Sequence, residues 1–339
     1  MTSSILIVWL KFSFCLALIG YAGSKLSRYG DIIADKTGMG GTWIGLVLMA
    51  TVTSLPELIT GVSAVSLAQA PNIAVGDVLG SCVFNLSLIM LLDWLQRGES
   101  VYSRASQGHI LSAGFGVILL GIVGFNIMLS AHTRLPAVAH VGYYSIVILF
   151  VYFIAMRTLF RYEHRQRAAY VGERIERYPD ITLREAAVRY ALMALVVVSA
   201  AAWLPFIGAA IAQTMGWHQT FVGTLFIAFA TSVPEIVVTI SAVRIGALDM
   251  AISNLLGSNL FNILILVIDD VFYAKGPLLA NVSALHAMTA LSASMMTGLA
   301  IVGLFYRPKA RVFKTVGWTS LFLLAIYLLN SFFLYLYSE

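Results

Sequence analysis

Two glutamates stand in nearly the same run of residues, once in each half of the chain. The runs are Thr53–Glu57 (TSLPE) and Thr231–Glu235 (TSVPE), 178 positions apart. Both lie inside long apolar segments, where ionisable side chains are rare and usually functional. Each run combines a carboxylate with two hydroxyls, and such hard oxygen ligands suit sodium or calcium rather than soft metals. The repeated run therefore predicts a buried cation site.

The proline of each run also changes its backbone. Pro56 has no N–H to offer the carbonyl of Val52, and Pro234 leaves the carbonyl of Ala230 free in the same way. A free carbonyl inside a bilayer needs another partner. Proline kinks alone are commonly structural. Beside a glutamate they predict a broken helix whose loosened carbonyls help to hold a cation.

A second pair of matching segments follows, with its two members 177 positions apart. They are Gly80–Asn85 (GSCVFN) and Gly257–Asn262 (GSNLFN). In each segment a serine and an asparagine lie four residues apart and so share one helical face. These residues are Ser81 with Asn85 and Ser258 with Asn262. We expect them to line the same site as the glutamates.

Ten apolar segments must position these motifs. The chain has 339 residues, of which 60% are hydrophobic and 11% are charged, a balance far from that of soluble domains. Because a span needs about 20 mostly apolar residues, we expect an all-α polytopic membrane protein with ten transmembrane helices. The expected spans lie near 4–23, 42–67, 72–95, 108–130, 137–158, 187–213, 218–242, 247–273, 279–305 and 315–336. The two cysteines, Cys15 and Cys82, lie in apolar segments, so we expect neither a disulfide framework nor a zinc site.

The basic residues orient the chain. With the N-terminus outside, 18 of the 21 Lys and Arg residues fall in inner loops, as the positive-inside rule favours. Ten spans then place the C-terminus outside as well. We expect the basic segment 161–186 to be a cytoplasmic linker between two five-helix repeats, 1–160 and 187–339. Since each repeat has an odd number of spans, the second is inverted, an arrangement common in secondary transporters.

Charge limits what the two glutamates can hold. Left empty, two ionised carboxylates repel each other. One divalent cation neutralises the pair, and so do two monovalent cations or two protons. A site that either set can fill is the physical basis for exchanging one species against the other.

The paired motifs resemble those of the prokaryotic-type sodium/calcium exchangers, within the cation/calcium exchanger superfamily. In that family two inverted alpha-repeats carry G-T-S-x-P-E followed by G-S-N-x-x-N or -D, here at 41–88 and 220–264. The resemblance implies exchange of about three sodium ions for one calcium by alternating access, with the first and sixth spans sliding across a fixed core. It implies calcium ligands at Glu57, Glu235, Thr53 and Thr231. It implies sodium ligands at Ala50, Ser54, Glu57, Ser81, Asn85, Ala228, Thr231, Ser232, Glu235, Ser258 and Asn262.

The sequence departs from the family pattern at several positions. Val52 and Ala230 stand where the family keeps glycine, and Cys82 stands where it keeps asparagine. Asn262 stands where potassium-dependent relatives place an aspartate, which argues against potassium co-transport. Asp77 stands where the second half has Asn254; it is either a third acid of the site or, as we expect, an acid at a wet helix end. Three further aspartates, Asp93, Asp269 and Asp270, are expected to mark span ends.

These observations predict a multi-pass protein of the cell (inner) membrane that exchanges sodium for calcium. We expect no enzymatic activity, no cofactor and no nucleotide or nucleic-acid partner; the expected partners are the two ions and the bilayer, and the chain is expected to act as a monomer. Exchange of protons for calcium, or of another divalent ion, at the same site is the alternative, although the serine-rich flanks favour sodium. An inverted repeat disfavours a passive cation channel. Ser54 near Glu57 lacks the further partner that a membrane hydrolase would need.

Overall fold

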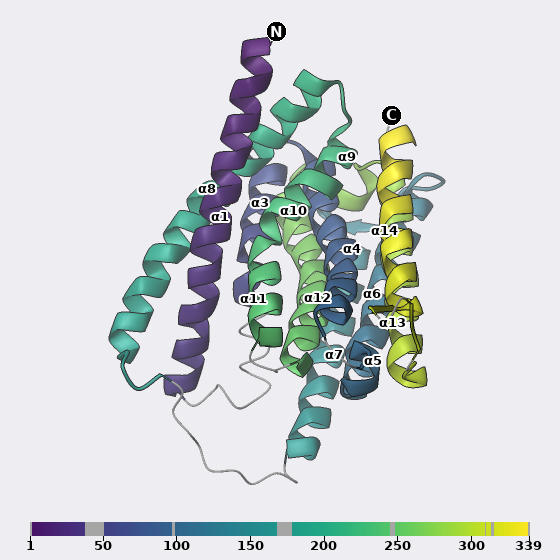
Figure 1. Ribbon diagram of the computed structural model, residues 1–339. Helices are drawn as coiled ribbons and strands as arrows, with labels where there is room; N and C mark the ends of the chain where they lie inside the picture. Colours follow the sequence, from purple (N-terminus) through teal and green to yellow (C-terminus); the bar gives the residue numbers. More distant parts are fainter. Residues whose placement is uncertain are drawn as a thin grey trace.

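The computed structural model describes residues 2–37, 51–96, 99–167, 178–244, 248–308, 310–312 and 315–337, and most of them are helical (Figure 1). Within these ranges, eight helices are long and apolar enough to cross a membrane, or nine if one bent pair is counted as a span. The eight are α1 (Thr2–Thr37), α4 (Pro71–Leu95), α6 (Gly108–Ser130), α7 (Tyr143–Arg167), α8 (Leu183–Met215), α12 (Leu248–Phe272), α13 (Leu285–Tyr306) and α14 (Trp318–Tyr337).

The remaining two expected spans contain the glutamate motifs. The span expected at 42–67 lies partly outside the described residues, and its described helix is the short α3 (Leu55–Ser66). The span expected at 218–242 is the bent pair. It consists of α9 (Gln219–Val222), a π-helical segment η1 (Gly223–Ile227), α10 (Ala228–Thr231) and α11 (Val233–Arg244). The total of ten spans therefore stays a prediction.

Both motif helices are interrupted at the serine of the motif. α3 begins directly after Ser54, whose backbone angles of φ −88° and ψ 14° lie outside the α-helical region. In the second half, α10 ends before Ser232 and α11 begins after it, with a bend of 46° between the two parts. The broken helices predicted from Pro56 and Pro234 are therefore confirmed.

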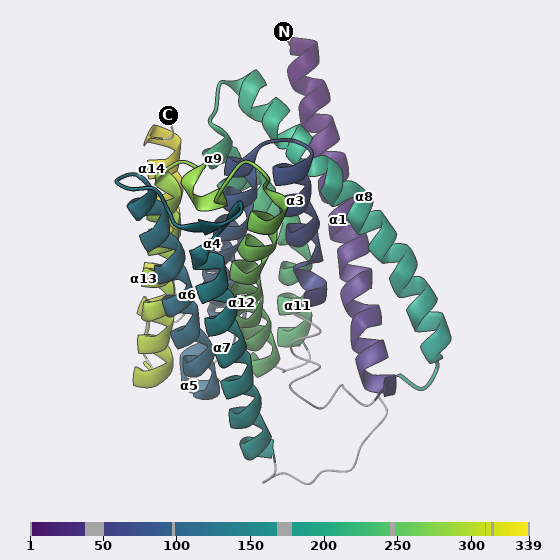
Figure 2. The same ribbon diagram turned by 180° about the vertical axis from the view of Figure 1, so that it is seen from behind.

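The helices form a central group with a cover on each side. α4 and α12 lie at the centre, and 78% and 72% of the residues in their apolar 18-residue stretches are buried. Both helices contact α3 and α11. The long helices α1 and α8 pack along each other on one side of the molecule, and α6, α7, α13 and α14 lie on the other (Figures 1 and 2). The start of α1 and the end of α14 lie at the same end of the molecule (Figure 1).

The outer pair contacts the motif helices closely. A Cβ atom on Gly23 of α1 would lie only 2.4 Å from Cγ of Pro234, so glycine is what lets α1 approach the start of α11. On the other side, Thr60 Oγ1 of α3 donates to the carbonyl of Ala201 in α8 at 3.3 Å. That carbonyl is available because Pro205, four residues later, has no N–H to offer it.

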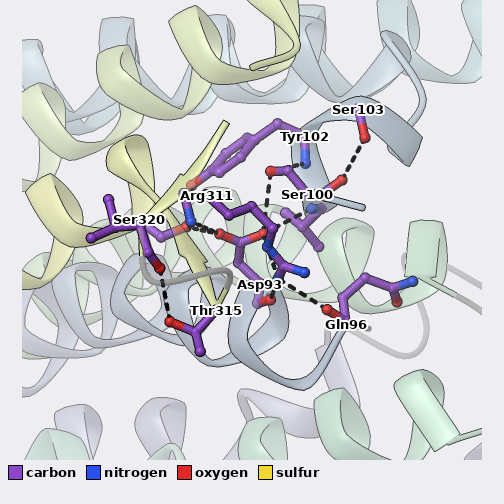
Figure 3. A network of polar contacts seen from close by, with 11 residues as sticks. Asp93, Gln96, Ser100, Tyr102, Ser103, Arg311, Thr315 and Ser320 are labelled. Carbon is purple, nitrogen blue, oxygen red and sulfur yellow. Dashed lines mark hydrogen bonds and ion pairs between the residues drawn. The ribbon is translucent and has the colours of Figure 1, made fainter. Parts of the chain in front are cut away.

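Asp93, near the end of α4, fastens the start of α14. Its carboxylate is buried and accepts hydrogen bonds from four groups (Figure 3). The donors are Ser100 Oγ (3.2 Å), Val101 N (2.9 Å), Gly317 N (2.6 Å) and Ser320 Oγ (3.0 Å). Val101 opens the short helix α5 (Val101–Arg104), and Gly317 closes a hairpin of β3 (Arg311–Val312) and β4 (Val316–Gly317). Burial also raises the pKa of Tyr102 in α5, whose phenol oxygen accepts from Ser320.

Asp270, near the end of α12, holds the start of α7 in a similar way. Its buried carboxylate also accepts from four groups. The donors are Leu278 N (2.7 Å), Gly142 N (2.9 Å), Ser145 Oγ (2.6 Å) and Tyr144 Oη (2.7 Å). Leu278 opens η2 (Leu278–Ala280), and Gly142 closes a hairpin of β1 (Ala137–Val138) and β2 (Val141–Gly142). The expectation that these aspartates mark helix ends is confirmed, and each one ties its helix to a hairpin from the opposite half of the chain.

Candidate cation-binding site

The two glutamates lie at corresponding places, each in the first turn of the helix that follows a break. Glu57 is in α3 and Glu235 is in α11, and both side chains are fully buried. The first turn of a helix carries unpaired N–H groups and the positive end of the helix dipole, and both favour a carboxylate there. The break at each serine therefore places an acid inside the protein where its own backbone stabilises it.

The hydrogen bonds around the two glutamates correspond pair by pair. Glu57 Oε1 accepts from Ser232 Oγ at 3.2 Å and from Ser81 Oγ at 3.4 Å. Glu235 Oε1 accepts from Ser54 Oγ and from Ser258 Oγ, both at 3.4 Å. Each carboxylate thus takes one hydroxyl from the opposite motif and one from the next long helix of its own half. All six predicted glutamate and serine ligands are brought together.

Among the described residues, the remaining oxygen of each glutamate has no partner. Oε2 of Glu57 and Oε2 of Glu235 are buried and accept no hydrogen bond, and within the described ranges no ion pair reaches either side chain. Burying ionised carboxylates without a counter-charge is very costly. Two free carboxylate oxygens with hydroxyls beside them are a donor set that fits a hard cation.

The two motif threonines are placed differently. Thr53 Oγ1 lies 3.3 Å from Ser258 Oγ. Thr231 Oγ1 instead donates to Asp77 Oδ1 at 2.8 Å. Asp77 is fully buried, so the expectation that it sits at a wet helix end is wrong. Its place four residues before Ser81 was the available signal, because that spacing puts both side chains on one face of α4.

The asparagines meet across the two halves. Asn85 Nδ2 donates to Asn259 Oδ1 at 3.1 Å, and Asn259 Nδ2 donates to the Cys82 carbonyl at 3.2 Å. Asn262 is fully buried, and in the described part of the chain neither its side-chain oxygen nor its nitrogen has a hydrogen-bond partner. Asn85 and Asn262 therefore keep free oxygens in the interior. Asn259 was not among the predicted site residues, although it is the counterpart of Cys82.

Two glycines let α4 approach the broken span. A Cβ atom on Gly80 would lie 2.3 Å from the carbonyl oxygen of Thr224, and one on Gly76 would lie 2.9 Å from the Thr224 nitrogen. Thr224 belongs to η1, and π-helical segments of this kind are frequent at functional sites. The carbonyl of Ala228, one of the predicted sodium ligands, lies 3.2 Å from Thr231 Oγ1. Ala50, the matching prediction in the first half, lies outside the described residues.

A further buried acid lies beyond Glu57. Asp269 of α12 is fully buried, and neither of its carboxylate oxygens has a hydrogen-bond partner among the residues that the structure describes. A Cβ atom on Gly61 would lie 2.5 Å from Asp269 Oδ2, so this carboxylate lies against the backbone of α3. Gly61 is one helical turn after Glu57, and Asp269 is therefore near the site without being part of it.

The fold and the buried oxygens together define a multi-pass membrane protein with a polar, acidic interior. The chain belongs to the sodium/calcium exchanger protein family, which it matches over residues 7–153 and 186–336. The resemblance drawn from the paired motifs is thus confirmed. The family is one of cation/calcium exchangers, which are transporters.

Individual relatives agree with this membership. The sodium/calcium exchanger MaX1 of Methanosarcina acetivorans is 29% identical over 279 residues, which are 73% of this chain and 77% of the relative. The inner membrane protein YrbG of Escherichia coli is 27% identical over 254 residues, 74% of this chain and 75% of the relative.

Solved structures share the fold. Native YfkE superposes with a TM-score of 0.64 at 18% identity and covers 98% of this chain and 92% of its own. The sodium-calcium exchanger NCX_Mj, soaked with sodium and strontium, gives a TM-score of 0.58 at 21% identity, covering 96% of this chain and 97% of its own.

Proposed function

We propose that this protein is a sodium/calcium antiporter that works by alternating access, with its ions bound between the two halves of the chain. One observation carries most of the weight. Each buried glutamate is held by one serine from each half and keeps one oxygen free. A site shared in this way belongs to neither half, which suits binding that must open first to one side and then to the other.

The proposed ion ligands are arranged around the two glutamates. Calcium binds between Glu57 and Glu235, with oxygens of Thr53 and Thr231 beside it. Sodium uses the same glutamates and the groups on either side of them. Those groups are Ala50, Ser54, Ser81, Asn85, Ala228, Thr231, Ser232, Ser258 and Asn262. The paired serines, which already point at the carboxylates, support sodium, because protons need no such cage of oxygens.

The two outer helices are the moving part. α1 and α8 pack most extensively along each other, and they also pack against the motif helices α3 and α11, as in the Gly23 contact with Pro234. They slide past a fixed core of α3, α4, α11 and α12. Ten spans form two inverted repeats, 1–160 and 187–339, joined by a cytoplasmic linker at 161–186, with both termini outside a cell (inner) membrane. The two blocks of the family match support this division.

Transport by purified protein in liposomes tests the function. Vesicles loaded with sodium are diluted into sodium-free buffer, and uptake of radioactive calcium is compared with uptake under an equal proton gradient. We expect the sodium gradient to drive uptake. Glu57→Gln and Glu235→Gln should each abolish it, because each removes a charge that calcium needs, whereas Glu99→Gln, at an exposed residue, should transport like the wild type.

Two results would contradict sodium/calcium exchange. If only the proton gradient drives uptake, the counter-ion is the proton. If neither gradient does so, or if both glutamine variants transport normally, the glutamates do not form the transport site. Competition by magnesium or manganese in the same vesicles shows whether calcium is the preferred divalent ion.

A further inference from the structure

Asp269 is a buried acid that has no structural contact to account for it. It lies in the last turn of α12, and among the described residues neither of its oxygens accepts a hydrogen bond and no ion pair reaches it. The next residue, Asp270, shows the contrast, because its carboxylate accepts four hydrogen bonds. Burying an acid without a partner is costly, and inside a membrane protein such an acid usually serves an ion or a proton.

Asp269 shares one face of α12 with the residues of the site. Seven residues make almost two helical turns and eleven make almost three, so residues at these spacings lie on the same side of a helix. Asn262 and Ser258 stand seven and eleven positions before Asp269. Ser258 donates to Glu235. The Asp269 carboxylate is therefore in line with the groups around the glutamates, about 10 Å beyond Asn262 along the helix.

The facing helix α3 leaves room for this carboxylate. Gly61 is four residues after Glu57, so it lies on the same face of α3, about 6 Å further along. A Cβ atom on Gly61 would lie 2.5 Å and 2.6 Å from the two Asp269 oxygens, so only glycine admits them there. Asp77 of α4 interacts electrostatically with both Glu57 and Asp269. Acidic groups thus continue from the glutamates to the last turn of α12.

This row of acids lies on one side of the glutamates. It leads toward the end of the molecule at which both chain termini lie, because α3 and α12 both end there (Figure 2). The repeat relates Asp269 to Leu92 and Asp77 to Asn254, both at an offset of 177, so the matching positions toward the other end are uncharged. A passage lined by one sign of charge between apolar walls concentrates ions of the opposite sign and speeds their binding.

We propose that Asp269 is a relay site, which holds a hard metal cation entering from the end with the chain termini before that cation reaches Glu57 and Glu235. In the proposed orientation this end is the outer face. The inference rests on the proposed cation transport at the two glutamates, and it gives Asp269 a role in delivery rather than in final binding. Asp269 therefore determines how fast calcium is captured from one face, and the turnover of the loaded protein does not depend on it.

Calcium–calcium exchange, measured from each face, tests the relay site without using sodium as the counter-ion. Right-side-out and inside-out membrane vesicles from cells that express the protein are loaded with unlabelled calcium, and they take up radioactive calcium through opposite faces. Protease access to a C-terminal tag identifies the face with the termini. For Asp269→Asn, which keeps the size and removes the charge, we expect kcat/KM for calcium from that face to fall about tenfold, the lower end of what charge steering contributes. We expect kcat to stay unchanged, and both quantities to stay unchanged from the opposite face.

Two further variants accompany this measurement. Glu99→Gln removes the charge of an exposed residue and should behave like the wild type from both faces. Gly61→Ala covers the case in which Asp269→Asn does not fold, because its Cβ would displace the Asp269 carboxylate without removing the charge. It should show the same fall in kcat/KM from the face with the termini. A purely structural role of Asp269 would instead change exchange from both faces alike.

The outcomes separate the relay site from the proposed function. An unchanged kcat/KM in Asp269→Asn from the face with the termini overturns the relay site, and so does an equal fall from both faces or a fall from the opposite face alone. A one-sided fall in calcium exchange by a protein in which a sodium gradient drives no uptake overturns sodium/calcium antiport and supports the relay site. No calcium exchange by the wild type overturns both.

Discussion

Replacing Asp270 by asparagine should destabilise the fold strongly, although the change is isosteric and lies away from the glutamates. The Asp270 carboxylate accepts four hydrogen bonds, two at each oxygen. Asparagine keeps one of these oxygens and replaces the other with an NH₂ group. In either orientation that NH₂ would face a backbone N–H, that of Gly142 or that of Leu278, and two donors cannot bond each other.

The size of the effect follows from the number of bonds lost. Hydrogen bonds to a charged group contribute about 1.5–3 kcal/mol each, and removing one partner of a buried charged network typically costs about 3–5 kcal/mol. Two bonds are lost or reversed here, and the other two become bonds to a neutral oxygen. We therefore expect a loss of about 3–5 kcal/mol, which for a chain of this size corresponds to a melting temperature roughly 4–7 °C lower.

The neighbouring residue provides the control. Asp269 is equally buried but has no hydrogen-bond partner, so Asp269→Asn loses no bond and removes a charge that burial disfavours. Thermal unfolding in detergent, followed by the loss of the monodisperse chromatographic peak, compares both variants with the wild type. Asp269→Asn should melt at or above the wild-type temperature and Asp270→Asn well below it. Equal melting temperatures for the two variants would show that the four hydrogen bonds do not hold α7 and α12 together.

Two glycine substitutions make further predictions with one shared control. Gly61→Ala should lower stability by about 1–3 kcal/mol, because its Cβ would lie 2.5 Å from an Asp269 oxygen that sits between packed helices. Gly23→Ala should slow calcium uptake, since its Cβ would lie 2.4 Å from Pro234 and push α1 away from α11. Gly114→Ala, with no atom within 4 Å of its Cβ, should change neither the melting temperature nor the uptake rate. If all three behave alike, these close approaches are not important.

The sequence predicted the centre of the site because its ligands are repeated. Glu57 and Glu235 stand in matching runs, and the serines that reach them stand at fixed distances along the chain. A repeat needs no knowledge of packing to be recognised. The proline breaks could be predicted for the same reason, since the loss of an N–H is a property of one residue.

Asp77 was misjudged because its environment depends on packing across the two halves. From sequence it lies only two turns after the start of a helix, where water is expected. In the structure, η1 covers this part of α4, and Gly76 and Gly80 bring the two backbones into contact. The hydrogen bonds that Asp93 and Asp270 accept from hairpins in the opposite half of the chain could not be predicted either, since those hairpins are more than 120 positions away.

In the proposed alternating-access mechanism, the pattern of bonds explains how one site can serve two sides of a membrane. Separating α3 from α11 would break the bond from Ser232 to Glu57 and the bond from Ser54 to Glu235 together, while the serines of α4 and α12 stay with their own glutamates. In the proposed cycle, opening toward either side of the membrane therefore breaks a hydrogen bond from a serine to a glutamate. As far as the glutamates are concerned, the two open states are similar in energy. Asp77 has no acidic counterpart in the second half. A carboxylate on α4 and an amide at the matching place on α12 therefore make the two sides of the site chemically different, so the two open states of the proposed cycle differ in energy.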